Sequence, residues 1–167
     1  MDQPIRKKRV LTPEQAYVKI RHYCAYQERT HQEVKVKLFG YGIKWADASE
    51  IISKLIEEGF LNEERFARAF AGGKFRTKDW GRKKIEVELR KKQISSYCIQ
   101  KALKEEIGMQ EYEKKLLKLA QKKWKSLTEK EISGYEKQAK TRHYLLLKGY
   151  ENDIITRIFK NLMDGEA

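Results

Sequence analysis

Residues that interrupt helices are scarce in this sequence. Only two prolines and ten glycines occur among 167 residues, and the stretches between them are rich in Lys, Glu, Leu, Ala and Gln. These residue types favour helices, and no alternation of apolar and polar residues typical of strands is present. The composition therefore predicts an all-α fold.

Cysteines and long apolar runs are also scarce. Cys24 and Cys98 lie far apart and lack the paired spacing of a zinc ribbon or a disulfide framework, so we expect two reduced thiols. No stretch approaches the roughly 18 apolar residues that a membrane span needs, and the N-terminus lacks the apolar segment of a signal peptide. We therefore expect a cytoplasmic protein that does not associate with membranes.

Groups typical of catalysis or metal binding are missing as well. The three histidines His22, His31 and His143 are isolated, and no glycine-rich loop that could hold phosphates occurs. Adjacent glutamates at 57–58 and 63–64 lie at helix boundaries, where capping and the helix dipole account for them. The sequence predicts no catalytic residue, metal or cofactor, and an enzyme such as a nuclease is the least favoured class of protein.

Positive charge, by contrast, is abundant. There are 37 Lys and Arg against 24 Asp and Glu, which leaves a formal net charge of +13. Such a surplus attracts polyanions. Hydrophobic residues make up 40% and aromatic residues 11% of the chain, too much for a disordered basic tail, so the charge is displayed on a folded surface. Nucleic acid, or an assembly that contains it, is the leading candidate partner.

Local signals mark where helices begin and end. A threonine followed three residues later by Glu or Gln is typical of a capping box at a helix start, and it occurs at Thr12, Thr30 and Thr128. Apolar residues at spacings of three and four follow the first two threonines. Gly42 and Gly59 end the next two helices. Residues 12–61 are therefore predicted to form a three-helix unit.

A short pattern recurs three times along the chain. It consists of a leucine, a turn residue four positions later and a large apolar residue after that, and it begins at Leu38, Leu89 and Leu145. Apolar residues also recur ten and fourteen positions after each leucine. Ahead of the leucine, the third copy carries a longer first connection. Chance similarity between amphipathic helices explains one such match but not all of them, so we interpret the pattern as a true repeat.

The repeat defines the organisation that we expect. Three tandem three-helix repeats occupy residues 12–61, 62–107 and 108–167, after a basic N-terminal arm at residues 1–11. Repeats of this kind bury their apolar faces against one another and stack into an elongated, curved array, which with its distinct ends is expected to be a monomer. The run Arg6–Arg9 in the arm is either a short segment that touches phosphates or a weak nuclear-localisation pattern.

The middle repeat is the most basic, with thirteen Lys and Arg against seven Asp and Glu. Its cations either bind phosphates as a cluster or form a solvated face balanced by Glu86 and Glu88 at helical spacing, and we favour binding. Trp80 either stacks on a base or holds a helix entry, of which the second is favoured. The cations that we assign to nucleic-acid or filament binding are Arg68, Lys74, Arg76, Arg82, Lys83, Lys84, Arg90, Lys91 and Lys92.

Three stretches resemble one known family in the order in which they occur. They are EVKVKL at 33–38, GFLNEERFA at 59–67 and WGRKKIEVEL at 80–89, and they resemble the bacterial RecX family, the regulators of the RecA recombinase. The resemblance covers nearly the whole chain and is looser in the third repeat. The chain departs from the family at Asn62 and Glu63, where Asp is frequent, and at Gln93, where Gly is frequent.

The resemblance implies a function as well as a fold. It implies a three-repeat helical array that lies in the groove of the RecA filament on single-stranded DNA and suppresses ATP hydrolysis and strand exchange, with no cofactor. The alternative is a stand-alone DNA-binding or architectural protein that binds duplex DNA with the helix near 81–92. On the first hypothesis, reversing Arg82, Lys83 and Lys84 to Glu is expected to weaken filament binding without unfolding the protein.

Overall fold

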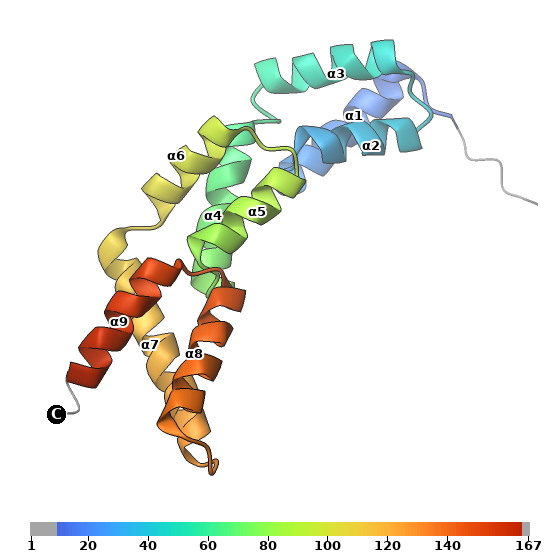
Figure 1. Ribbon diagram of the computed structural model, residues 1–167. Helices are drawn as coiled ribbons and strands as arrows, with labels where there is room; N and C mark the ends of the chain where they lie inside the picture. Colours follow the sequence, from blue (N-terminus) through green and yellow to red (C-terminus); the bar gives the residue numbers. More distant parts are fainter. Residues whose placement is uncertain (1–9, 165–167) are drawn as a thin grey trace, which may run out of the picture. The chain divides into compact units, whose positions relative to one another are not determined.

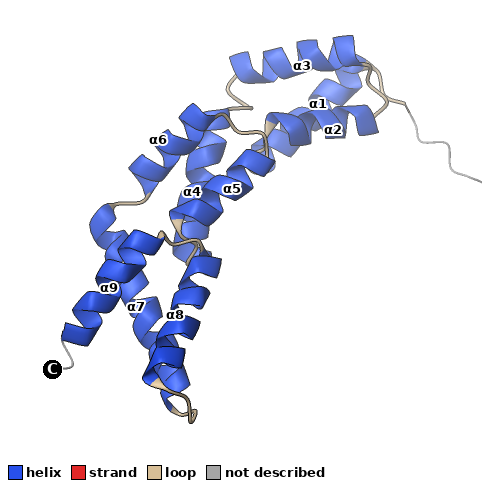
Figure 2. Cartoon of the chain, in the orientation of Figure 1, coloured by secondary structure: helices blue, strands red, loops and turns tan. Residues whose placement is uncertain are grey.

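The computed structural model describes residues 10–164, and within this range the chain forms helices and loops without a strand (Figures 1 and 2). The Arg6–Arg9 run of the predicted arm lies outside the described residues. The helices are α1 (Pro13–Tyr26), α2 (His31–Gly40), α3 (Trp45–Glu57), α4 (Glu63–Lys78), α5 (Arg82–Lys91), α6 (Ser96–Glu106), α7 (Met109–Thr128), α8 (Gly134–Lys148) and α9 (Asn152–Asp164). The all-α prediction is confirmed.

The helices are grouped into two compact units. The first unit comprises Met1–Phe66 together with Lys92–Ile94, and the second comprises Ala67–Lys91 together with Ser95–Ala167. The second repeat therefore contributes residues to both units. The repeat boundaries predicted above at 61–62 and 107–108 stay a prediction.

The first unit has a core formed by one stripe from each of its helices. Ala16, Ile20, Leu38 and Leu55 are fully buried in it. The two capping boxes predicted in this unit are present: the Thr12 hydroxyl accepts from the backbone N–H of Gln15, and the Thr30 hydroxyl accepts from that of Glu33. Because these caps satisfy backbone donors at the helix starts, they fix where α1 and α2 begin.

The three-fold repeat is visible at the turn that follows α2, α5 and α8. The same turn position has a positive φ in each copy, namely 83° at Gly42, 60° at Gln93 and 94° at Gly149. The preceding leucine and the following apolar residue are buried in all three copies. The predicted tandem helical repeats are thus confirmed, and Gln93 occupies a left-handed conformation that normally favours glycine.

The helix start predicted at Thr128 is wrong. Thr128 is the last residue of α7, and its hydroxyl donates to the carbonyl of Trp124 at 3.0 Å. The neighbouring Leu127 is buried, so the apolar stripe of α7 continues to the helix end. Helix α8 begins instead after Ser133, whose hydroxyl accepts from the backbone N–H of Glu136 at 3.1 Å. A threonine can bond backward within a helix as readily as it caps one, and the local pattern does not separate the two cases.

The extra length of the third repeat lies mainly in its first two helices. Helix α7 has 20 residues, whereas α1 has 14 and α4 has 16. Helix α8 has 15 residues, whereas α2 and α5 have 10 each. The longer first connection predicted from the sequence is therefore chiefly a lengthening of two helices.

Within the second unit, α5 and the turn after α8 make close backbone contact. The N–H of Gly81 donates to the carbonyl of Lys148 at 2.7 Å, and the N–H of Lys83 donates to that of Gly149 at 3.0 Å. A Cβ added at Gly81 would lie 2.3 Å from the carbonyl carbon and oxygen of Gly149. Only residues without side chains permit this approach, which joins the second repeat to the third.

Candidate nucleic-acid interface

The predicted cations of α4 are partly neutralised by α6. Arg68 lies 3.2 Å from a carboxylate oxygen of Glu106 and 3.4 Å from one of Glu105, and Arg76 lies 3.6 Å from the other Glu106 oxygen. These pairs are solvent-exposed, so each contributes little to stability and can exchange for other anions. The net charge of this surface is nevertheless lower than the count of cations along the sequence indicates.

Trp80 is packed between lysines instead of presenting an open ring face. The Nζ atoms of Lys74 and Lys84 lie 5.1 Å and 4.8 Å from its ring centroid, and Phe70 meets it edge-on at 6.4 Å. The Lys84 amine also donates to the carbonyl of Leu147 at 3.4 Å. This environment favours the packing role for Trp80 over base stacking. It also shows that Lys74 and Lys84 pack against the Trp80 ring.

Arg82 is bound within the second unit. Its guanidinium donates to the carbonyl of Ile107 at 2.9 Å and lies 4.4 Å from the ring centroid of Tyr112, while its backbone N–H donates to the Tyr112 hydroxyl at 3.0 Å. Reversing its charge would leave that carbonyl without its donor. The expectation that Arg82, Lys83 and Lys84 can all be reversed without disturbing the fold is therefore not supported for Arg82.

The remaining predicted cations lie on and after α5. Arg90 pairs with Glu86 at 2.6 Å and Lys91 with Glu88 at 2.7 Å, as the helical spacing of these charges indicates. Lys83 is exposed. Lys92 belongs to the first unit and lies 3.7 Å from a carboxylate oxygen of Glu33. Eight of the nine predicted residues thus lie in the second unit, most of them paired with carboxylates or held in tertiary contacts, and their assignment to binding stays a prediction.

A second row of cations, which the sequence analysis missed, runs along α7. Four exposed lysines spaced at four, four and three residues lie on one side of this helix: Lys114, Lys118, Lys122 and Lys125. We call them the α7 lysine face. Among residues 10–161, whose side chains the structure describes, none of the four has an ion-pair partner. Residues 114–125 contain six lysines and no acid, a local signal that charge counts over whole repeats conceal.

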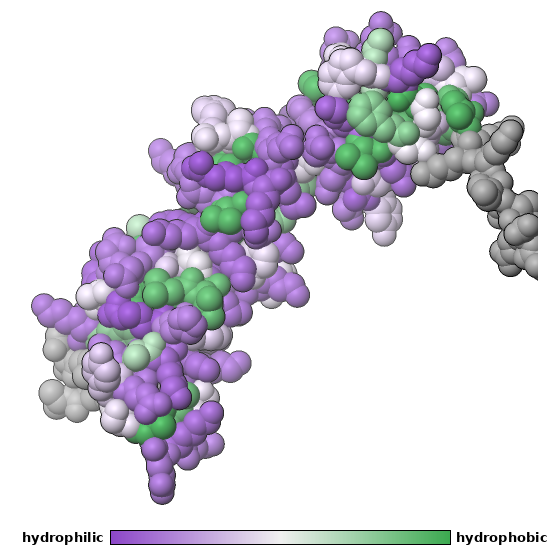
Figure 3. Space-filling model, turned by 45° about the vertical axis from the view of Figure 1, so that its right-hand side comes forward, coloured by the Kyte–Doolittle hydropathy of each residue, from purple (hydrophilic) through white to green (hydrophobic). Residues whose placement is uncertain are grey.

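Two further expectations concern association with membranes and the state of the cysteines. On the face shown in Figure 3, hydrophilic residues predominate and apolar residues form separate patches. Within residues 10–164, no helix combines the length and the apolar character that a membrane crossing needs. Both cysteines are free and buried, as expected of reduced thiols.

Comparison with known families identifies matches in two parts of the chain. Residues 62–103 match the model described as RecX, second three-helix domain, and residues 110–159 match RecX, third three-helix domain. The two matched segments lie within the predicted second and third repeats.

Curated relatives give a consistent result. The regulatory protein RecX of Clostridium perfringens (strain 13 / Type A) is 30% identical over 138 residues, which cover 83% of this chain and 64% of that protein. The regulatory protein RecX of Oceanobacillus iheyensis is 26% identical over 152 residues, which cover 90% of this chain and 54% of that protein. The chain thus spans between about half and two thirds of the length of these relatives.

Two solved structures share the fold. The crystal structure of RecX from Lactobacillus salivarius aligns with a TM-score of 0.82 and 32% identity, covering 90% of this chain and 96% of that one. A crystal structure of regulatory protein RecX aligns with a TM-score of 0.79 and 22% identity, covering 89% and 71% of the two chains. The second likeness concerns the fold alone.

Proposed function

The chain belongs to the RecX family, and from that premise we propose that it regulates a RecA recombinase by binding the RecA filament on single-stranded DNA. Its relatives carry the name regulatory protein, which is consistent with a role that is not catalytic. In this proposal the protein acts as a monomer in the cytoplasm, uses no cofactor and catalyses no reaction itself.

The α7 lysine face is the observation that supports this proposal best. Helical rise places successive lysines of the row about 4.5–6 Å apart along the helix axis, so one polyanion can follow the row over about three turns. Because none of its four lysines has an ion-pair partner in the described chain, their charge is available to phosphates. Binding through this face releases counterions and is therefore expected to be sensitive to salt.

Binding would change the activity of the filament by restricting the conformational changes of the recombinase protomers. A ligand that contacts both DNA and protein at several points gains effective concentration for each further contact. If it binds one conformation of the protomers better than others, it holds the filament in that conformation. We therefore expect it to inhibit ATP hydrolysis and strand exchange, and to bind the helical groove where DNA and protein are both accessible.

The direct test is the ATPase activity of the cognate RecA on single-stranded DNA, with this protein titrated from substoichiometric to equimolar amounts. Inhibition that persists when bare DNA is added in excess supports filament regulation. Inhibition that disappears in proportion to added bare DNA, including duplex, contradicts it and favours the stand-alone DNA-binding alternative. No effect on the ATPase at equimolar protein also contradicts it.

A pair of variants tests which face carries the binding. Lys118→Glu with Lys122→Glu reverses two cations of the α7 lysine face. Arg90→Glu with Lys91→Glu reverses two paired cations of α5 and changes the net charge by the same amount. We expect the α7 variant to raise the half-inhibitory concentration about tenfold and to lower the salt slope of binding by about two. Equal effects of the two variants would indicate that only net charge matters.

A further inference from the structure

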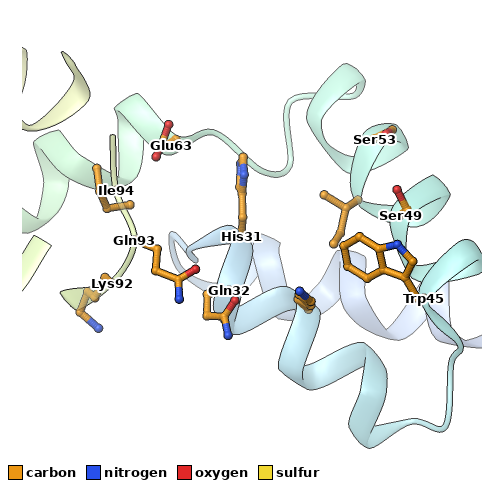
Figure 4. Close-up of a pocket in the computed structure, with 11 residues that line it drawn as sticks. His31, Gln32, Trp45, Ser49, Ser53, Glu63, Lys92, Gln93 and Ile94 are labelled. Atoms are coloured by element: carbon orange, nitrogen blue, oxygen red, sulfur yellow. The ribbon is translucent and has the colours of Figure 1, made fainter. Parts of the chain in front are cut away.

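The first unit contains a pocket to which no function has been assigned so far. Its volume is about 350 Å³, within the range of roughly 300–1,000 Å³ that is usual for small-ligand sites. Figure 4 shows Trp45 of α3 on one side, His31 and Gln32 of α2 along the floor, and the segment Lys92–Ile94 opposite. Every residue that lines the pocket belongs to the first unit.

Trp45, which lines one side of this pocket, forms an exposed aromatic pair with Phe39, which does not line it. Trp45 is 58% exposed and Phe39 is 41% exposed, and their ring centroids lie 6.3 Å apart. Side chains of this size normally contribute to the core. Neither one belongs to the core of the first unit, where the buried positions are filled by other residues. Packing therefore does not account for a tryptophan at position 45.

The other two repeats show that the fold does not require this tryptophan. Trp45 is the first residue of α3, and the first residues of the corresponding helices α6 and α9 are Ser96 and Asn152. The position of Phe39, one residue after the repeated leucine, is occupied by Arg90 and Leu146 in the other copies. The aromatic pair is therefore specific to the first repeat and is not part of the shared architecture.

A cation and several amide and hydroxyl groups accompany the aromatic pair. The Lys35 amine lies 4.4 Å from the ring centroid of Trp45 and 5.9 Å from that of Phe39. Gln32, Ser49 and Gln93 line the same pocket and offer both donors and acceptors. An aromatic ring beside a lysine, with hydrogen-bonding groups around it, is the arrangement that binds unpaired bases of single-stranded nucleic acid.

We propose that this pocket binds one unpaired base of single-stranded nucleic acid, stacked on Trp45, with the adjoining phosphate next to Lys35. An apolar peptide is a poorer match because the apolar residues that line the pocket besides the tryptophan, Ile52 and Ile94, are half-buried or buried. Glu63 also lines the pocket, and its carboxylate would accept a hydrogen bond from the N3–H of a thymine or from the exocyclic amine of another base. The proposal rests on the proposed function in one respect, namely that the nucleic acid is the single-stranded DNA of a RecA filament. It adds a contact with a base to the expected contacts with phosphates.

The test compares two labelled probes in fluorescence anisotropy with the full chain and no recombinase. One probe is a twelve-nucleotide oligothymidylate, and the other has the same length and charge but abasic sites in place of the bases. We expect the wild-type protein to bind the thymidylate probe about tenfold more tightly, because stacking on one base contributes that order of affinity. Trp45→Ala should abolish this preference, while Trp45→Phe should keep most of it.

Tyr26→Ala is the matched control, since Tyr26 is 86% exposed on α1 and does not line the pocket. It should bind both probes as the wild-type protein does. An unchanged thymidylate preference in Trp45→Ala, with a circular dichroism spectrum like that of the wild type, overturns the proposal. So does a Trp45→Ala variant that keeps the thymidylate preference but loses binding to RecA in a separate assay with the recombinase, because a protein would then occupy the pocket. Because the anisotropy assays contain no recombinase, failure of ATPase regulation does not affect them.

Discussion

Two tyrosines of the second unit lie against each other with their ring centroids 4.9 Å apart, yet their hydroxyl groups have different environments. The Tyr112 hydroxyl accepts from the backbone N–H of Arg82 and donates to the carboxylate of Glu151. The Tyr150 hydroxyl is buried and has no hydrogen-bond partner among residues 10–161, the part of the chain with described side chains. Burial of an unsatisfied hydroxyl costs free energy, whereas a satisfied one contributes to stability.

Removing each hydroxyl should therefore have opposite consequences. We expect Tyr150→Phe to leave the free energy of unfolding unchanged or to raise it by up to about 1 kcal/mol. Tyr112→Phe should lower it by about 1–3 kcal/mol, because the Arg82 N–H and the Glu151 carboxylate lose a partner. Urea unfolding of both variants followed by circular dichroism measures the difference. A loss in Tyr150→Phe as large as that in Tyr112→Phe would contradict this account.

At this scale the sequence identifies residue types but not their partners. The ion pairs within α5 could be predicted from helical spacing, because Glu86 and Arg90 lie four residues apart. The contacts of Arg82 with Ile107 and Tyr112 could not, because they depend on how distant segments pack together. Counting cations along the chain therefore predicted a binding face where the structure has placed some of them in tertiary contacts.

At the scale of the helices, the contact between the start of α5 and the turn after α8 leaves no space for a side chain at position 81. Its geometry is set by Gly81, whose added Cβ would approach the Gly149 carbonyl to 2.3 Å. Backbone atoms cannot be moved aside as the end of a flexible side chain can. The two segments would have to separate, and the hydrogen bond from Gly81 to Lys148 would lengthen.

Gly81→Ala should accordingly lower the free energy of unfolding by about 1–3 kcal/mol, the usual range for overpacking a tight contact. Gly73→Ala is the matched control, since Gly73 lies inside α4 with no atom within 4 Å of an added Cβ. That variant should gain about 0.5–1 kcal/mol from helix propensity. Thermal or urea unfolding of both proteins gives the values. A Gly81→Ala protein as stable as the wild type would show that the contact is loose.

Helix boundaries were predictable where backbone chemistry alone decides them. The caps at Thr12 and Thr30 and the turn at Gly42 follow from local hydrogen bonding and from the positive φ. The boundary at Thr128 was mispredicted because the buried Leu127 extends α7 through a sequence that resembles a cap. At Gln93 the repeat predicted a turn, and the structure keeps it there with φ 60°, even though the residue is not glycine.

At the scale of the whole molecule, a buried thiol and two buried phenols make the free energy of unfolding depend on pH in the alkaline range. Burial raises the pKa of the Cys24 thiol from its ordinary value of 9.0 to about 11. Burial also raises the pKa of the Tyr112 and Tyr150 phenols above their ordinary value, and the hydrogen bond to Glu151 adds to the effect at Tyr112. The folded state thus keeps protons that the unfolded state releases. Stability from this source is complete below about pH 9 and decreases as pH rises through 11.

The melting temperature should therefore be nearly constant from about pH 7 to 8.5 and then fall steadily between about pH 9 and 11. Cys24→Ala should flatten the fall in that window, by up to about 2 kcal/mol of the pH-dependent loss, even if its stability at neutral pH is lower. Differential scanning calorimetry at a series of pH values compares the slopes. The same slope in both proteins would show that the thiol does not contribute.

Because Lys92–Ile94 join Met1–Phe66 in one compact unit, the second repeat completes a unit that the first repeat begins. This affects how a gene for such a protein can gain or lose copies. A recombination event at residues 61–62 would follow the sequence repeat but separate the first unit from three of its residues and from the start of α4. Duplications or deletions that preserve folding would have to carry the 92–94 segment along with the preceding copy. The number of repeats is therefore harder to change by unequal crossing-over than the periodicity of the sequence suggests.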